Sequence, residues 1–298
     1  MQYDEKELLI DMLNNLERLW PLIWLVQLVS PALRDLIRGY VWEEDEQPVG
    51  MVKFHRWGAT NTWYITTVAV LPSYRRRGIG RKLVQVALDY IRERGGRMTL
   101  LDVIAGNVPA YTLYEQLGFE RFTGSSKFNY NQDELPPELP LPHGYTVLPL
   151  DFLDWHADYQ LAQRIIPASV QRYEPAEEAR FRRPQFARPL MPIIRRAIGV
   201  REGKIAIHTA SDGQLVALAE YAVRVRPGGL NYTNMRIDPA HAELASYLVQ
   251  NLMRTTQRLS PGRRTEFTIP QWQDMVIEAA SAGGCVKRLE YHRMGMTL

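Results

Sequence analysis

Hydrophobic positions along the chain follow two periods, which divide its first 132 residues into predicted helices and strands. Apolar side chains recur every three or four residues in some stretches, which predicts helices over 4–20, 31–38, 78–94 and 109–117. β-Branched and aromatic residues are enriched in others, which predicts strands over 39–43, 49–57, 62–70, 97–104, 119–123 and 127–130. Gly118 follows the last helix and is expected to end it. This mixture of strands and amphipathic helices indicates an α/β domain.

A proline-rich stretch separates this part of the chain from the rest. Residues 133–143 read DELPPELPLPH, and proline fixes φ and removes backbone donors. We therefore expect an extended linker there, between a first domain over 1–132 and a second over 144–298. Both flanking pieces are long enough to bury a hydrophobic core of their own.

The order of helices and strands repeats after the linker. Helices are predicted over 152–165, 242–259 and 271–282, and strands over 145–150, 204–210, 215–225, 231–237, 266–269 and 286–296. The stretch NMRIDP at 234–239 parallels TVAVLP at 67–72. The second domain is therefore predicted to be a diverged copy of the first.

Composition narrows the class of protein. Hydrophobic residues make up 46% and charged residues 23% of the 298, which predicts packed globular domains. Lys and Arg number 36 against 33 Asp and Glu, so the chain lacks the strong positive charge of a nucleic-acid binder. The single cysteine, Cys285, excludes an intramolecular disulfide framework and a cysteine-based zinc site, and we expect no metal. It also fits a reducing compartment.

The apolar segments do not predict contact with a membrane. The first residues, MQYDEKE, are acidic, unlike the basic start of a secretion signal. The most apolar run, over 19–29, has 11 residues and contains Pro21 and Gln27. A bilayer-spanning helix needs about 20 apolar residues. We therefore expect a cytoplasmic protein without membrane contact.

The segment 66–82, TTVAVLPSYRRRGIGRK, carries the first candidate chemistry. A strand that ends at Val70 is followed by a turn and a helix start, which places backbone N–H groups and the positive end of a helix dipole at one spot. The glycines let a diphosphate approach the backbone closely, and the arginines add charge-assisted contacts. Leu83 stands where a dinucleotide fingerprint has its third glycine, and no Walker sequence follows. The candidate anion site consists of Arg75, Arg76, Arg77, Gly78, Ile79, Gly80 and Arg81.

A second segment, VIAGNVPAYTLYEQLGF at 103–119, completes a pair of motifs. Together the two segments resemble the GCN5-related N-acetyltransferase (GNAT) superfamily, with its Gln/Arg-x-x-Gly-x-Gly/Ala loop and its later signature around a Tyr. The residues that carry the match are Arg75-x-x-Gly78-x-Gly80 in the first segment, and Asn107, Ala110 and LYEQLGF at 113–119 in the second.

The resemblance implies a fold and a cosubstrate. It predicts two GNAT-like domains, each a mixed, mostly antiparallel sheet flanked by helices. Acetyl-CoA would bind the first domain, with the backbone of Val68 and Val70 pairing with the pantetheine amides as an added strand does. The loop over 75–81 would hold the diphosphate. Asn107, in one motif with Ala110, would bond the pantetheine arm, although an N-cap of the following helix is an alternative or additional role.

Tyr114 is the residue that the resemblance implies as general acid. Acyl transfer from a thioester to an amine expels a thiolate, and a nearby phenol donates a hydrogen bond or a proton to the departing sulfur. The alternative interpretation is a tyrosine packed on a helix face with its hydroxyl in water.

The general base is less clear from the sequence. A primary ammonium must lose a proton before it attacks. Many relatives place a Glu where this chain has Tyr64, and alternation along a strand would put Tyr64, Thr66, Val68 and Val70 on one face. Substitutes are His55, Tyr64 acting through water, or more weakly Asp102. Water alone is a further alternative. A second departure from the family is that the chain opens with a predicted helix rather than a strand.

The leading hypothesis is an N-acetyltransferase that moves an acetyl group from acetyl-CoA to a primary amine. The acceptor would be a small molecule or a peptide. The alternative is a non-catalytic acyl-CoA sensor or interaction module. The second domain lacks the glycines and the Tyr, so it is expected to be a degenerate copy that binds acetyl-CoA poorly. The whole chain would be a monomeric pseudo-dimer or a homodimer.

Overall fold

The computed structural model describes residues 38–58, 60–130, 135–150, 155–181, 199–225 and 229–298. The predicted helix over 4–20 lies outside the described residues, as does the helix over 31–38 except for Arg38, which begins a strand. The chain forms two compact units. One runs to Thr99 and includes Leu298, and the other is Leu100–Thr297.

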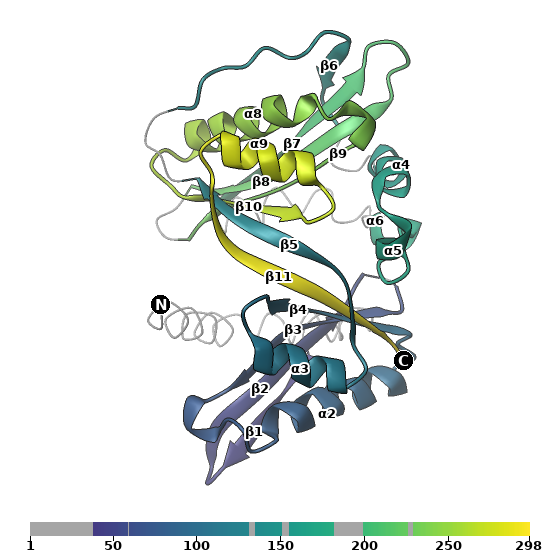
Figure 1. Cartoon of the computed structure of the whole chain (residues 1–298), viewed down its shortest axis with the longest axis vertical. Coiled ribbons are helices and arrows are strands. Elements are labelled where there is room, and N and C mark those ends of the chain that lie inside the picture. Colours follow the sequence, from purple (N-terminus) through teal and green to yellow (C-terminus); the bar gives the residue numbers. More distant parts are fainter. Residues whose placement is uncertain (1–37, 59, 131–134, 151–154, 182–198, 226–228) are drawn as a thin grey trace. The chain divides into compact units, whose positions relative to one another are not determined.

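The first unit is an antiparallel meander with a helix against one face (Figure 1). Its elements are β1 (Arg38–Glu44), β2 (Gln47–Arg56), β3 (Thr62–Val70), the short 3₁₀ helix η2 (Pro72–Tyr74) and α2 (Ile79–Glu93). Helix α2 buries its apolar stripe, from Ile79 to Ile91. Its Tyr90 ring meets those of Phe54 and Trp63 at centroid distances of 5.4 and 6.0 Å. Aromatic and aliphatic burial therefore fixes the direction of α2, and with it the position of the loop before α2.

Strand β3 contains a β-bulge that the sequence did not predict. Lys53 of β2 pairs with Thr67, but the next residue, Phe54, pairs with Ile65. Thr66 is thus an extra residue, and its hydroxyl donates to the carbonyl of Lys53 at 3.2 Å. A bulge of this kind shifts all following residues to the opposite face of the sheet.

The second unit contains a long mixed sheet. Its strands follow one another in the order β4-β11-β5-β10-β9-β8-β7-β6. Their bounds are β4 (Met98–Ile104), β5 (Glu120–Tyr130), β6 (Tyr145–Leu148), β7 (Val200–Thr209), β8 (Leu215–Arg224), β9 (Asn231–Ile237), β10 (Thr265–Pro270) and β11 (Val286–Thr297). The helical elements are α3 (Val108–Gln116), α4 (His156–Ile165), α5 (Ala168–Gln171), α6 (Glu178–Phe181), η3 (Pro239–His241), α8 (Leu244–Leu259) and α9 (Asp274–Ala282). Pairing is antiparallel from β6 to β9 and parallel between β9 and β10.

Strands β5 and β11 tie together segments from both sides of the predicted linker. The strands predicted over 119–123 and 127–130 are one continuous strand, β5, which pairs antiparallel with both β10 and β11 (Figure 1). Strand β11, from the end of the chain, lies between β4 and β5. The boundary between the compact units therefore falls inside β4 rather than at the linker. Residues 135–142 have neither helix nor strand, as expected from their prolines.

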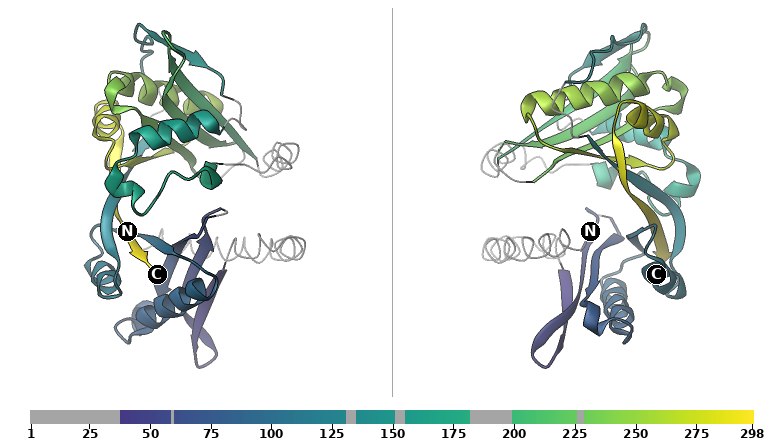
Figure 2. Two further views of the ribbon diagram at one scale, coloured as in Figure 1. Left: turned by 90° about the vertical axis from the view of Figure 1, so that its right-hand side faces the viewer. Right: turned by 60° about the vertical axis from the view of Figure 1, so that its left-hand side comes forward.

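Helices cover both faces of the sheet in the second unit. Figure 2 shows α8 and α9 on one face and α4 on the other. The first face carries a large core in which Leu248 and Leu252 meet Ile237 and Phe267. On the second face, Leu161 of α4 packs with β7 and β8. Within the described part of the chain, no helix is long and apolar enough to cross a bilayer.

Candidate functional site

The loop after β3 turns the chain sharply into α2. The N–H of Leu71 still donates to the carbonyl of Val49 at 2.9 Å, and the turn of η2 follows. Arg76 and Gly78 then adopt positive φ angles, 66° and 80°. A Cβ atom built at Gly78 would meet nothing within 4 Å. Glycine is favoured there because of its backbone conformation rather than for lack of space.

At the start of helix α2, the N-cap residue has no side chain that accepts a hydrogen bond from the first backbone N–H groups. Its N-cap, Gly78, makes no side-chain cap hydrogen bond, and the first turn contains no acidic residue. The first N–H groups of a helix have no partner within the helix and carry partial positive charge. Gly80 stands at the second helical position and adds no side chain in front of them. This helix end has the donors and the partial positive charge that an anion site needs, and its binding role stays a prediction.

The arginines of the loop surround this helix end. Arg75 donates through Nε to the carbonyl of Val70 at 3.1 Å, and Arg77 donates to the carbonyl of Ser73 at 3.2 Å. Both side chains are exposed, and Arg77 also forms an ion pair with Glu44 at an N–O distance of 3.5 Å. The other predicted residues differ in burial: Arg76 is exposed, Arg81 is half-buried, and Ile79 is buried and anchors the helix.

The end of β3 offers backbone groups on the side away from β2. Leu71 and Val49 form a hydrogen-bonded pair, so the next pair, Val70 with Gly50, is a non-hydrogen-bonded one. The N–H and C=O groups of Val70 therefore point away from β2, and those of Val68, two residues earlier, do the same. These are the two residues predicted to pair with a pantetheine arm.

The predicted single face of Tyr64, Thr66, Val68 and Val70 is wrong because of the bulge. Val68 pairs with Val52, on the side that α2 covers, whereas Tyr64 pairs with His55 on the opposite side. The two rings lie 5.9 Å apart. Burial lowers the pKa of His55, so its imidazole is neutral at pH 7. A proton acceptor is therefore present on this side of β2 in place of a carboxylate.

Asp102, the third candidate base, is already engaged. Arg293 of β11 donates to both of its oxygens, through Nε at 2.8 Å and Nη2 at 2.9 Å. The remaining nitrogen of Arg293 donates to Glu174 at 2.9 Å. Both carboxylate oxygens of Asp102 are therefore engaged by one guanidinium group. The sequence could not indicate this, because Asp102 and Arg293 are 191 residues apart.

Helix α3 holds the second group of predicted residues. Asn107 is its N-cap and accepts a hydrogen bond from the N–H of Ala110 at 3.2 Å, as the alternative interpretation expected. Tyr114 is buried, and burial raises its pKa to about 12. Its ring meets Phe119 edge-on at 6.0 Å. Gly118 ends the helix with a φ of 96°. The phenol of Tyr114 is thus protonated throughout the neutral range.

The fold and the two motif segments define the class of protein. Residues 10–119 match the family model of the acetyltransferase (GNAT) family. The chain therefore contains a GNAT domain.

Three known proteins illustrate the relationship. N-alpha-acetyltransferase 30 of Schizosaccharomyces pombe is 36% identical over 77 residues, which are 26% of this chain and 51% of that protein. Mycothiol acetyltransferase of Corynebacterium glutamicum is 37% identical over 82 residues, 27% of each chain. The chain thus matches about half, or less, of the length of these relatives. A tandem GNAT protein from the clavulanic acid biosynthesis pathway shares the fold over 88% of this chain and 82% of its own, with a TM-score of 0.60 and 16% identity.

Proposed function

We propose that this protein transfers the acetyl group of acetyl-CoA to a primary amine, with the donor bound by the segment from β3 to α2. The observation that carries the proposal is the start of α2. Its N–H groups have no side-chain cap, its second position is Gly80, and exposed arginines stand beside it. A diphosphate suits such a site in charge and in size.

The strand beside this helix end supplies the second part of the donor site. The backbone groups of Val68 and Val70 that face away from β2 match the amides of a pantetheine arm. Arg75 holds the carbonyl of Val70 and would release it, or bond it together with the donor. The side chain of Asn107, with Ala110 behind it, would contact the same arm while still capping α3.

Tyr114 would assist the departure of the thiol. The amine nitrogen forms a C–N bond with the acetyl carbon, the C–S bond breaks, and the sulfur leaves with the electron pair. The buried phenol of Tyr114 is protonated, so it can donate to that sulfur. Burial also strengthens such a hydrogen bond, because water does not compete for it.

The acceptor amine must lose its proton with little help from a base on the protein. Tyr64 and His55 offer no carboxylate, and Asp102 is paired with Arg293. An α-amino group, with a pKa of about 8, is roughly a quarter neutral at pH 7.5, whereas a lysine amine with a pKa of about 10.4 is about 0.1% neutral. We therefore propose an acceptor amine of low pKa on a small molecule or a peptide. Its proton would go to water or to the neutral imidazole of His55.

A non-catalytic acyl-CoA sensor is the second candidate. The observation that favours it is that none of the three candidate bases supplies an unpaired carboxylate: Tyr64 and His55 are not acids, and Asp102 is paired with Arg293. The sensor predicts acetyl-CoA binding without release of free thiol in the presence of any amine. It also predicts that Tyr114→Phe leaves acetyl-CoA binding unchanged.

Isothermal titration calorimetry with acetyl-CoA tests the donor site. The wild-type chain is expected to bind at micromolar concentration, at roughly −7 to −9 kcal/mol. Gly80→Glu should abolish binding, because it places a side chain and a negative charge at the helix end. Gln85→Glu, which adds the same charge on the exposed side of the same helix, is the matched control and should bind as wild type.

The outcomes separate the two candidate functions. Binding that is lost in Gly80→Glu, together with thiol release in a screen of amines, supports the acetyltransferase. Binding without thiol release from any amine supports the sensor. No binding by the folded wild-type chain contradicts both.

A further inference from the structure

The second unit contains a strand–loop–helix segment built like the one that we assign to the donor. Strand β9 ends at Ile237, Asp238 follows, and Pro239 begins η3. In the first unit, β3 ends at Val70, Leu71 follows, and Pro72 begins η2. Helices α8 and α2 come next in the two segments. The spacing from the strand end to the proline is the same, so the same backbone groups should be open, and α8 then begins two residues sooner after the proline than α2 does.

Ile237 has the same exposed backbone edge as Val70. Asp238 donates its N–H to the carbonyl of Val216 at 2.8 Å, so the preceding pair, Ile237 with Ala217, is a non-hydrogen-bonded one. The N–H and C=O groups of Ile237 therefore point away from β8. The parallel ladder between β9 and β10 extends only to Asn234, so β10 does not satisfy them.

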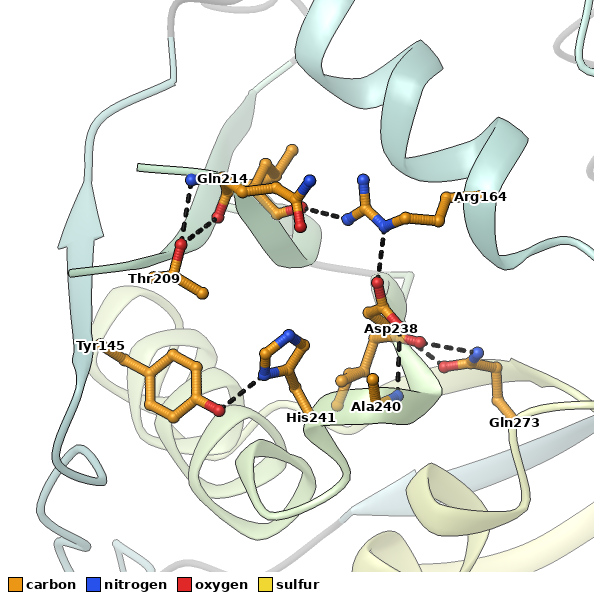
Figure 3. Close-up of polar contacts among 10 residues, drawn as sticks. Tyr145, Arg164, Thr209, Gln214, Asp238, Ala240, His241 and Gln273 are labelled. Atoms are coloured by element: carbon orange, nitrogen blue, oxygen red, sulfur yellow. Dashed lines mark hydrogen bonds and ion pairs between the residues drawn. The ribbon is translucent and has the colours of Figure 1, made fainter. Parts of the chain in front are cut away.

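The side chain of Gln273 bonds both of these backbone groups of Ile237. The carboxamide of Gln273 accepts from the N–H of Ile237 at 2.9 Å and donates to its C=O at 3.0 Å (Figure 3). The glutamine is completely buried. One carboxamide thus bonds both backbone groups, as the N–H and C=O of a single residue on an antiparallel neighbouring strand would.

Gln273 stands at the position that Asn107 has in the first of the two sequence repeats. Each residue is the N-cap of the helix that follows, α9 or α3. The side chain of Asn107 is one methylene shorter, and its oxygen accepts a hydrogen bond from the N–H of Ala110. Gln273 makes no cap hydrogen bond and extends to Ile237 instead.

In the loop after Ile237, two carboxylates of the chain itself stand where an anionic ligand would bind. Asp238 accepts from the N–H of Ala240 at 3.1 Å and from Arg164 at 2.6 Å (Figure 3). Glu243 is the N-cap of α8, and Tyr145 donates a hydrogen bond to it. Negative charge already occupies this helix end, and a phosphate would be repelled there.

We propose that Gln273 is a built-in substitute for a pantetheine arm, so that the second segment is permanently filled and the chain binds one acetyl-CoA. Asp238 and Glu243 take the place of the diphosphate in the same way. The second unit then keeps the geometry of a ligand-filled GNAT sheet without a ligand. The helix residue that corresponds to Tyr114 is Ala280, seven positions after the N-cap in both cases, so no acid is present there either.

Chemical rescue in the full-length chain tests the role of Gln273. Gln273→Gly removes the fragment propionamide and retains a residue that N-caps tolerate. Its melting temperature should fall by about 5 °C, because two buried backbone groups lose their partners. Propionamide should restore most of this loss in a saturable way and should leave the wild-type protein unchanged. Gln273→Met fills the space but makes no hydrogen bond. Its melting temperature should fall by a similar amount, and propionamide should not restore it.

Stoichiometry provides a second test that needs no variant. Calorimetry of the wild-type chain should give one acetyl-CoA per chain, and two would overturn the proposal. It would also be overturned by a Gln273→Gly variant that is as stable as wild type, or that is destabilised and does not respond to propionamide. If the wild-type chain binds no acetyl-CoA, the donor assignment fails by itself. The rescue then still decides whether Gln273 bonds the backbone groups of Ile237.

Discussion

The segments β3–η2–α2 and β9–η3–α8 leave their strands at the same point but meet different side chains there. In the first, glycines and exposed arginines stand at a helix end without a side-chain cap, and Arg75 bonds the carbonyl of Val70. In the second, Asp238 and Glu243 stand at the helix end, and the buried carboxamide of Gln273 covers the edge. A common backbone path therefore does not imply a common function, because a few side chains decide whether the backbone groups remain available to a ligand.

The largest expected effect is on kcat and comes from Tyr114, whose phenol is replaced by Ala280 at the corresponding position of the second copy. Tyr114→Phe should lower kcat about 100- to 1,000-fold, because the leaving thiolate loses its proton donor, while the Kd for acetyl-CoA changes less than about threefold. Single-turnover thiol release and calorimetry measure the two quantities. Tyr111→Phe, on the same helix and beside His292, is the control and should be near wild type. Equal losses in both variants would contradict the role of Tyr114.

The choice of acceptor should give the next largest effect. At pH 7.5, a peptide with a free α-amine should be acetylated with a kcat/KM about 100-fold higher than a lysine side chain in an N-blocked peptide of the same sequence. The kcat/KM for the better acceptor should rise with pH and level off above the pKa of its amine. A lysine substrate that reacts equally well at neutral pH would show that another group of the chain acts as a strong base.

The left-handed turn at Gly78 should matter more for the ligand than for folding. Gly78→Ala introduces a Cβ at a φ of 80°, which costs about 1–2 kcal/mol unless the loop moves. We expect the Kd for acetyl-CoA to rise about tenfold. Gly95→Ala carries the same kind of strain, at a φ of 72° and with open space around it, at the far end of α2. It should lower the melting temperature without changing the Kd, and a weaker Kd there would contradict a local effect.

The smallest effect should appear in the pH dependence of stability. Burial opposes ionisation of Asp238, but the hydrogen bonds from Arg164 and Ala240 and the charges of Arg164 and His241 together outweigh it, and the pKa of this carboxyl is lowered. Its stabilisation is therefore complete above the unfolded pKa of about 3.9 and is lost as the pH falls through the lower folded pKa. Asp238→Asn should cost about 1 kcal/mol at pH 7, and the difference from wild type should vanish toward pH 2. Urea unfolding at several pH values measures this, and a constant difference would contradict it.

The helices and strands of the described residues were largely predictable, because periodicity and local residue type decide them. Gly118 ends α3 as expected, and β1 and β2 overlap the strands predicted over 39–43 and 49–57. The short helices α5 and α6 were not predicted, since four residues carry no detectable period. The candidate loop was found because its residues are adjacent in the chain, although its assignment to acetyl-CoA remains a proposal.

The sequence by itself determined the element order, the repeat and the residues of the candidate loop, all of which depend on neighbours a few positions apart. The tertiary structure alone decided three other matters. It placed the bulge at Thr66, it inserted β11 beside β5, and it brought Gln273 to Ile237. Strand register and side-chain hydrogen bonds join positions far apart in the chain, and their energy depends on burial that no local pattern records.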